Sequence, residues 1–336
     1  MKKIIITGGL GFIGSNLVEF LIKKKFYVII VDNFSYSSNI NNLQDISKNK
    51  YRIYRCDINN TRKIKLILKK YKPKCIFNLA AETHVDRSID NPAKFLKSNF
   101  QGVFNLLEVL REFKEIKLVH ISTDEVYGDI SRSKFSKEND PYLPSSPYAA
   151  SKAASDLLIK SYVRTYKLNC IITNCSNNYG PKQFPEKLIP KIILNIILSK
   201  NIPIYGDGKN EREWIYVKDH CSALYHIFKF AKAGDQFNIG SGDICSNIII
   251  TKKLIKEYKK LRFKTNSNIT FVKDRPGHDR RYALNSNKLK KINWKKQFSL
   301  TQGLKKTLEW YLDNKNWLLK LNKTKYTKRL GCLTDD

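Results

Sequence analysis

Two short segments of this sequence concentrate side chains that can transfer protons. Thr123, Asp124 and Glu125 directly follow the apolar run 118–121, which is typical of a buried strand. In an open α/β sheet, ligands collect outside the carboxyl ends of the strands, so we expect these three side chains at a binding edge. The alternative is a strand end with ordinary carboxylates.

Tyr148 and Lys152 form the second segment. They are four residues apart in a stretch rich in Ala and Leu, so both are expected to project from one face of a helix. A neighbouring ammonium group favours the phenolate and lowers the pKa of a tyrosine from about 10 towards neutrality. Such a tyrosine can take a proton from a sugar hydroxyl. The alternative is an unrelated surface tyrosine.

The N-terminus has the pattern of a dinucleotide-binding βαβ unit. The apolar strand 4–6 leads into Gly8, Gly11 and Gly14, and a helical pattern follows. Glycines at this spacing allow a tight turn and a close approach of the backbone to a pyrophosphate, which the helix N-terminus attracts. Asp32 ends the next apolar strand, close to the separation of ~20 residues expected for an acid that binds the ribose and favours NAD over NADP.

Together these motifs resemble the extended short-chain dehydrogenase/reductase family, and within it the dTDP-glucose 4,6-dehydratases. The resemblance covers residues 1 to about 310. The adjacent carboxylates of Asp124 and Glu125 discriminate within the family, because sugar-nucleotide 4-epimerases lack such a pair, whereas GDP-mannose dehydratases and UDP-glucuronate decarboxylases keep only the Glu. Further matching stretches are 79–88 (LAAETHVDRS), 177–181 (NNYGP), 184–190 (FPEKLIP), 212–214 (REW) and 274–282 (DRPGHDRRY).

The resemblance implies NAD as cofactor and dTDP-glucose as substrate. It assigns cofactor contacts to Gly8, Gly11, Phe12, Ile13, Gly14, Asp32, Asn33, Phe34, Ser35, Asp57, Ile58, Leu79, Ala80, Ala81, Thr83, Asn99, Tyr148, Lys152 and Asn178. It assigns substrate contacts to Thr83, Thr123, Asn177, Glu186, Lys187, Leu188, Pro203, Ile204, Tyr205, Arg212, Asn247, Asp274, Arg275 and His278. Guanidinium groups suit a diphosphate because they offer planar, bidentate donors, and Arg280 and Arg281 are further candidates.

The chemistry implied by the resemblance begins at C4 of the sugar. Tyr148, supported by Lys152, removes the 4-hydroxyl proton while a hydride passes to NAD, and Thr123 hydrogen-bonds the 4-oxygen. Glu125 then removes the C5 proton, and Asp124, which must be protonated, donates to the departing 6-hydroxyl. Hydride returns to C6 and gives a 4-keto-6-deoxy sugar of the rhamnose type, so NAD is expected to stay bound. The sequence departs from the family pattern at Asn78, commonly His, and at Glu213, mostly Asp.

The alternation of apolar runs and helical patterns predicts an α/β protein. Expected strands are 3–7, 27–31, 51–55, 75–79, 118–122, 169–173 and 213–217, and expected long helices are 92–113 and 148–166. We predict a Rossmann-type doubly wound parallel sheet with a smaller C-terminal α+β substrate-binding lobe. The NAD-binding domain would comprise 1–178 and about 205–240, and the lobe about 179–204 and 241–322. Residues 323–336 read as a polar tail.

The composition of the chain indicates its partners, the state of its cysteines and its cellular location. The formal net charge of +32 suggests nucleic-acid binding, but the lysines are spread along the whole chain, which favours a compositional bias and no nucleic-acid or membrane partner. Seven scattered cysteines without C-x-x-C favour reduced thiols over disulfides or a zinc site. With no signal peptide or apolar span, we expect a cytoplasmic protein. The resemblance implies a homodimer.

Two other functions compete with the dehydratase. The first is a UDP-glucose 4,6-dehydratase or a UDP-sugar 4-epimerase, since thymine and uracil differ by one methyl group, worth only about 1–3 kcal/mol. The second is a non-catalytic NAD-binding protein that uses its positive charge to bind RNA. Such a protein has no need for the carboxylate pair and the Tyr–Lys pair together.

Overall fold

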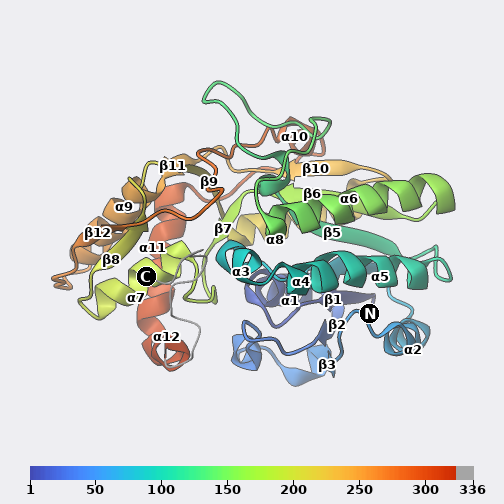
Figure 1. The fold of residues 1–336 in the computed structure, drawn as a ribbon. Coiled ribbons are helices and arrows are strands. Elements are labelled where there is room, and N and C mark those ends of the chain that lie inside the picture. Colours follow the sequence, from blue (N-terminus) through green and yellow to red (C-terminus); the bar gives the residue numbers. More distant parts are fainter. Residues whose placement is uncertain (323–336) are drawn as a thin grey trace.

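The computed structural model describes residues 1–322, and its larger part is a three-layer α/β/α sandwich (Figure 1). Within those residues a parallel sheet of seven strands runs in the order β10-β6-β5-β4-β1-β2-β3. Helices cover both faces, which is why the central strands are continuous apolar runs rather than alternating ones. The strands are β1 (Lys3–Thr7), β2 (Tyr27–Asp32), β3 (Tyr51–Arg55), β4 (Cys75–Asn78), β5 (Lys117–Thr123), β6 (Cys170–Cys175) and β10 (Gln236–Ile239). The predicted doubly wound sheet is confirmed.

Two hydrophobic clusters attach the helices to the sheet. On one face, α1 (Phe12–Lys23) and α8 (Val217–Phe230) pack against side chains of the central strands. On the other face, α2 (Thr61–Tyr71), α5 (Gly102–Leu110) and α6 (Pro147–Tyr166) bury a separate cluster. All strands of this sheet are parallel, so their carboxyl ends form one edge. The predicted site residues after β1, β2, β4 and β5 therefore meet there.

The predicted helix 92–113 is not continuous. Pro92–Phe95 (α4) leads into a π-helical segment, Leu96–Gln101, before α5 begins. Within that segment the hydroxyl of Ser155 donates to the carbonyl of Asn99 at 2.6 Å, and a side chain that hydrogen-bonds backbone of this kind is a common cause of such an interruption. The short helix α3 (Val85–Asp90) precedes α4.

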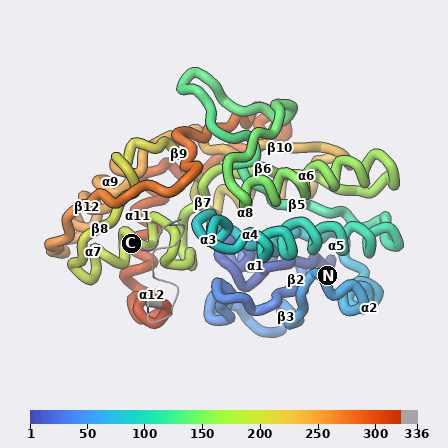
Figure 2. Tube along the Cα trace, in the orientation of Figure 1, coloured from blue at the N-terminus to red at the C-terminus, as the bar shows by residue number. Residues whose placement is uncertain are grey.

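A second lobe lies beside the sandwich and has its own core (Figure 2). One of its sheets orders β11 (Ile244–Ser246), β9 (Glu211–Tyr216) and β7 (Asn177–Tyr179), and another pairs β12 (Ile269–Val272) with β8 (Ile202–Tyr205). Its helices are α7 (Leu188–Ile197), α9 (Asn247–Lys260), α11 (Leu300–Asp313) and α12 (Lys315–Asn322), and α10 (Asn287–Lys291) packs near β10.

The chain crosses between the two parts more than once. The predicted strand 213–217 forms as β9, but it pairs in the small sheet, whereas β10 is the strand that returns to the large one. The segment 129–146 also leaves the sandwich: Ser136 forms a bridge with Leu284. No helix in residues 1–322 is long and apolar enough to cross a membrane. The predicted polar tail, 323–336, lies outside the described residues.

Candidate active site

The two proton-transferring segments meet at the carboxyl edge of β5. Thr123 is the last residue of β5, and its hydroxyl accepts a hydrogen bond from the Glu125 amide at 3.3 Å, which starts a 3₁₀ turn over Asp124–Tyr127. Tyr148 and Lys152 lie in the first turns of α6. All five side chains, Thr123, Asp124, Glu125, Tyr148 and Lys152, line one cavity.

The environments of the two carboxyl groups favour the protonated form of Asp124. Asp124 is 3 % exposed, and burial, followed by the charges of Glu125 and Glu213, raises its pKa well above the usual value. One of its oxygens, Oδ2, is buried without a hydrogen-bond partner in the described residues. Burial also raises the pKa of Glu125, but Arg275, Arg212 and Lys187 oppose that rise.

Tyr148 departs from the expectation drawn from the sequence. Burial, and next the charge of Glu125, raises the pKa of this phenol well above its usual value, whereas we expected Lys152 to lower it. The reason is that the Lys152 ammonium donates to the carbonyl of Ile121 at 2.8 Å, and the phenolate would have to form in a desolvated site beside a carboxylate. Tyr148 is therefore a neutral phenol in this structure.

A buried polar network behind Lys152 was not predicted. The Lys152 nitrogen lies 3.3 Å from Nε2 of His120, which is also 3.6 Å from Oδ1 of Asp156. On its other side His120 contacts the Asn78 amide at 3.0 Å. Burial lowers the pKa of Lys152 to about 8 and raises that of Asp156 to about 6. Lys152 and Asp156 are four residues apart on a helix, so their spacing could have indicated that they lie close together. The contact between Asn78 on β4 and His120 on β5 has no such signal in the sequence.

The glycine loop forms a cradle at the start of α1. Gly8 has φ +66°, and a Cβ atom there would lie 2.9 Å from the amide nitrogen of Ala80, so neither this backbone conformation nor this close approach suits a larger residue. Gly11, Phe12, Ile13 and Gly14 line the same cavity. The first turn of a helix has amide groups without intrahelical partners, which suits a pyrophosphate.

Asp32 lies beside this cradle. Its Oδ2 accepts the Leu10 amide at 3.0 Å, and its Oδ1 accepts the Phe34 amide and the Ser38 hydroxyl. Because a carboxylate has about four acceptor positions, one remains for a ribose hydroxyl. The buried amide oxygens of Asn177 and Asn178 also lack partners in the described residues, and both residues line the cavity. These features fit a dinucleotide.

Most predicted cofactor residues line the cavity, but two do not. Besides those named above, the cavity is lined by Asn33, Ser35, Asp57, Ile58, Leu79, Ala80, Ala81 and Thr83. Asn99 is buried elsewhere and holds the Glu82 backbone and the Ser151 hydroxyl. The Phe34 side chain lies under the guanidinium of Arg55, 5.5 Å from ring centroid to Cζ.

The predicted substrate residues divide between the cavity and the second lobe. Thr83, Thr123, Asn177, Glu186 and Lys187 line the cavity. The remaining residues lie in the lobe or its connecting loops and do not line that cavity: Leu188, Pro203, Ile204, Tyr205, Arg212, Asn247, Asp274, Arg275 and His278.

Several of these lobe residues are held by other protein groups. Arg275 donates to Asp86 at 2.9 Å, and the Tyr205 hydroxyl donates to the second oxygen of the same carboxylate. Arg212 donates to the carbonyls of residues 211 and 279. His278 and Asp274 pair at 2.6 Å.

Comparisons with known proteins agree over nearly the whole chain. The profile of the family described as GDP-mannose 4,6 dehydratase matches residues 5–307. The dTDP-glucose 4,6-dehydratase of Neisseria meningitidis serogroup B is 42% identical, covering 98% of this chain and 99% of that one. The chain belongs to the dTDP-glucose 4,6-dehydratase family. The crystal structure of the dTDP-glucose 4,6-dehydratase from Bacillus anthracis in complex with NAD superposes with a TM-score of 0.88 at 38% identity, covering 96% of this chain and 100% of that one. The crystal structure of the dTDP-glucose 4,6-dehydratase from Streptomyces venezuelae, also with NAD, superposes with a TM-score of 0.89 at 38% identity, covering 95% of this chain and 99% of that one.

The resemblance to the dTDP-glucose 4,6-dehydratases that the sequence motifs indicated is therefore confirmed.

Three lobe residues do not have the surroundings expected of nucleotide ligands. Ile204 is 1% exposed in the core of the lobe. Arg280 is exposed and pairs with Asp207, and Arg281 donates to the carbonyls of residues 131 and 134.

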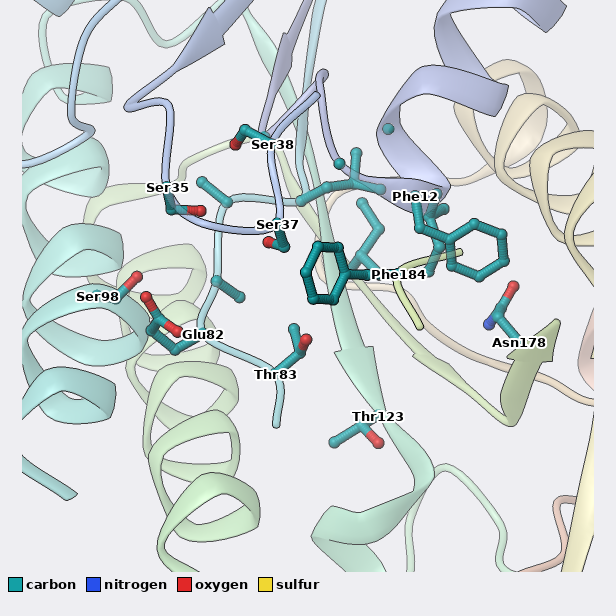
Figure 3. Close-up of a pocket in the computed structure, with 18 of the residues that line it drawn as sticks. Phe12, Ser35, Ser37, Ser38, Glu82, Thr83, Ser98, Thr123, Asn178 and Phe184 are labelled. Atoms are coloured by element: carbon teal, nitrogen blue, oxygen red, sulfur yellow. The ribbon is translucent and has the colours of Figure 1, made fainter. Parts of the chain in front are cut away.

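The cavity also has lining residues that were given no role from the sequence. Figure 3 shows Ser37 and Ser38 on the loop after β2, Glu82 and Ser98 at the left below Ser35, and the ring of Phe184 between Ser37 and Phe12. Gln183 lines the cavity as well. Glu82 and Phe184 lie in the matching stretches 79–88 and 184–190, and the serines belong to a stretch of small polar residues after Asp32, so the sequence did carry a signal for these residues.

Proposed function

We propose that this protein converts dTDP-D-glucose to dTDP-4-keto-6-deoxy-D-glucose and reuses one bound NAD in every cycle. The observation that carries the proposal is the Asp124–Glu125 pair, which shares a cavity with Tyr148 and Lys152 in a member of the dehydratase family. A 4-epimerase needs the Tyr–Lys pair only. The additional acid and base serve an elimination.

The residues that would hold NAD are those of the glycine cradle and Asp32. The cradle meets the pyrophosphate with backbone amides, and the acceptor position left on Asp32 meets a ribose hydroxyl. When bound, NAD accepts the hydride of C4, returns it to C6, and adds a positive charge that favours the phenolate of Tyr148. The family relatives crystallised with NAD support this cofactor.

At C4 the protein supplies a proton acceptor and an anchor. Tyr148 takes the proton of the 4-hydroxyl group, and Thr123 donates a hydrogen bond to the same oxygen. Lys152 is an ammonium at neutral pH, because its pKa of about 8 lies above 7. Its charge offsets part of the cost of a buried phenolate. Oxidation at this carbon makes the C5 proton acidic.

At C5 and C6 the two carboxyl groups take opposite roles. Glu125 removes the C5 proton as a base, and Asp124 donates its proton to the 6-hydroxyl group, which leaves as water. Neighbouring carboxyls with separated pKa values are the usual basis for such a division. The rise in the pKa of Asp124 and the three cations near Glu125 support this assignment rather than the reverse.

The second lobe would bind the nucleotide. Arg212 and Arg275 are the proposed diphosphate ligands, with Asn247, Pro203 and Tyr205 near the base, and His278 and Asp274 beside the arginines. Arg275 has a buried Nε without a hydrogen-bond partner in residues 1–322, although its terminal nitrogen is held by Asp86. That free donor supports an anionic ligand at this point.

We also propose a homodimer in the cytoplasm. Leu96, Phe104 and Leu157 are 53%, 36% and 56% exposed. They lie on the π-helical segment before α5, on α5 and on α6, which are neighbouring segments, so they offer an apolar face to a second copy. Six cysteines of the described residues are free thiols, which suits a reducing compartment. Sedimentation velocity tests the dimer: a single species at the monomer mass at micromolar concentration contradicts it.

Incubation of the purified protein with dTDP-glucose tests the activity. We expect a 4-keto-6-deoxy product, identified by NMR, with no net reduction of NAD. Interconversion of UDP-glucose and UDP-galactose without a keto product would assign the chain to the epimerases. Absence of both activities in protein that contains NAD would favour a binding function.

A further inference from the structure

Three segments that are distant in the sequence are joined by one carboxylate. The Tyr36 hydroxyl donates to Oε1 of Glu186 at 2.8 Å, and Nε of Arg87 donates to Oε2 at 3.2 Å. Tyr36 lies on the loop after β2, Arg87 on α3, and Glu186 on the loop before α7. The first two belong to the sandwich, and the third leads into the second lobe.

The packing around this carboxylate is close. The Glu186 side chain is 5% exposed, and the guanidinium carbon of Arg87 lies 4.3 Å from the centre of the Tyr36 ring, within the range of a cation–π contact. The Tyr36 and Phe184 rings meet edge to face at 5.7 Å. Burial, and next the charge of Glu186, raises the pKa of Tyr36, so its hydroxyl stays a proton donor.

The contacts bridge two walls of the cofactor cavity. Ser35 and Ser37, on either side of Tyr36, line one wall, and Phe184 and Glu186 line another. Figure 3 shows the Phe184 ring next to the loop that carries Ser35, Ser37 and Ser38. The same loop follows Asp32, the proposed ribose ligand. A bound dinucleotide would therefore be enclosed between the loop after β2 and the loop before α7, which Tyr36, Arg87 and Glu186 hold together.

We propose that Tyr36, Arg87 and Glu186 form a clasp that retains NAD in the cavity between turnovers. This inference rests on the proposed function, because an enzyme that returns the hydride to its own substrate never needs to release the cofactor. A dehydrogenase that exchanges NAD in every cycle would be slowed by such a clasp. Tyr36 and Arg87 are thus cofactor-retaining residues outside the motifs that bind NAD directly.

The clasp should affect dissociation of NAD more than the chemical steps. Removal of the Tyr36 hydroxyl leaves an oxygen of the buried Glu186 without its donor, and hydrogen bonds to charged groups are the stronger class. We expect Tyr36→Phe to raise the NAD dissociation rate by about 10–100-fold. Arg87→Lys keeps the charge but loses the planar contact with the Tyr36 ring, so a smaller rise is expected.

The experiment measures release of NAD without any sugar nucleotide. Purified protein is saturated with NAD and freed of excess by gel filtration, and the NAD that leaves is reduced by added alcohol dehydrogenase and ethanol and followed by absorbance. Tyr54→Phe is the matched control, because it also removes one tyrosine hydroxyl with a partner, Tyr71 at 2.9 Å, but does not border the cavity. Melting temperatures verify that each variant folds.

The outcomes separate the clasp from the proposed function. Fast release from Tyr36→Phe and slow release from the wild type and Tyr54→Phe support the clasp. Equal, slow release from all proteins overturns it and leaves the dehydratase intact. A wild-type protein that binds no NAD overturns both proposals. If Tyr36→Phe does not fold, Arg87→Lys decides: release at the wild-type rate overturns the clasp.

Discussion

The catalytic edge of the sheet and the nucleotide lobe hold their charged groups in different ways. At the edge, Asp124, Tyr148 and Lys152 are 3%, 7% and 2% exposed, and their pKa values are shifted mainly by burial. In the lobe, Arg275 is paired with a carboxylate and Arg212 with backbone carbonyls.

This difference suggests a division of labour. Groups that transfer protons need shifted pKa values, which burial supplies before any ligand binds. Groups that bind a diphosphate need only charge and geometry, and protein partners can hold them until the ligand arrives. The edge should therefore control turnover, and the lobe should control affinity for the nucleotide.

The strongest test of this division is Tyr148→Phe. Loss of the phenol removes the proton acceptor at the 4-oxygen, so we expect turnover to fall by about 10⁴-fold, the upper end of the range for a lost acid–base group. KM should change little. Tyr162→Phe is the control on the same helix, because its hydroxyl contacts Glu108 outside the cavity. A similar loss in both variants would contradict a chemical role for Tyr148.

Asp124→Asn should have the next largest effect, about 10²–10³-fold in turnover. The raised pKa of Asp124 means that the acid is available at neutral pH and is lost as the pH rises through that value. The turnover rate of the wild type should therefore decrease at alkaline pH. In Asp124→Asn, the part of this decrease that is due to deprotonation of Asp124 should be absent. Matching alkaline limbs in pH–rate profiles of the two proteins would rule out the acid role.

The buried carboxyl groups of the edge should also make the free energy of unfolding fall as the pH rises. The pKa of Asp156 is raised to about 6, so the folded state binds its proton more tightly than the unfolded chain. This stabilising term is complete below the unfolded value of about 3.9 and is lost as the pH rises through 6, a loss of about 3 kcal/mol. Urea unfolding between pH 4 and 7 should show this slope in the wild type and a smaller one in Asp156→Asn. Identical slopes would contradict it.

The lobe should respond in KM rather than in turnover. Arg275→Lys loses the planar donors that suit a diphosphate, and we expect KM for dTDP-glucose to rise about 10–30-fold with kcat nearly unchanged. Arg280→Lys is the matched control, because this arginine is exposed and paired with Asp207. Equal effects of the two substitutions would remove the basis for assigning Arg275 to the diphosphate.

The parts predicted well from the sequence are those set by local patterns. The glycine cradle, Asp32 and the segment Thr123–Glu125 each follow an apolar strand, and parallel strands bring their carboxyl ends to one edge. Tyr148 and Lys152 lie on one helix, as their spacing predicted, but their position beside Thr123 also requires α6 to pack against β5. Periodicity and position in the sheet therefore predicted the strand-end segments, whereas the joining of Tyr148 and Lys152 to them in one site was implied by the family resemblance.

The parts that were missed depend on contacts between distant segments. His120 meets Lys152 only because β5 packs under α6, and Asn78 meets His120 only through the register of β4 and β5. Tyr36 and Glu186 are far apart in the sequence as well. The direction of the pKa shift of Tyr148 depends on burial, which the spacing of a Tyr–Lys pair does not determine.

The most direct test of the central claim is Glu125→Gln, studied anaerobically with dTDP-glucose. If oxidation at C4 precedes removal of the C5 proton by Glu125, the variant should accumulate enzyme-bound reduced cofactor, visible by its near-ultraviolet absorbance, and release almost no keto product. Keto product at the wild-type rate without accumulated reduced cofactor would contradict the assignment of Glu125 as the base.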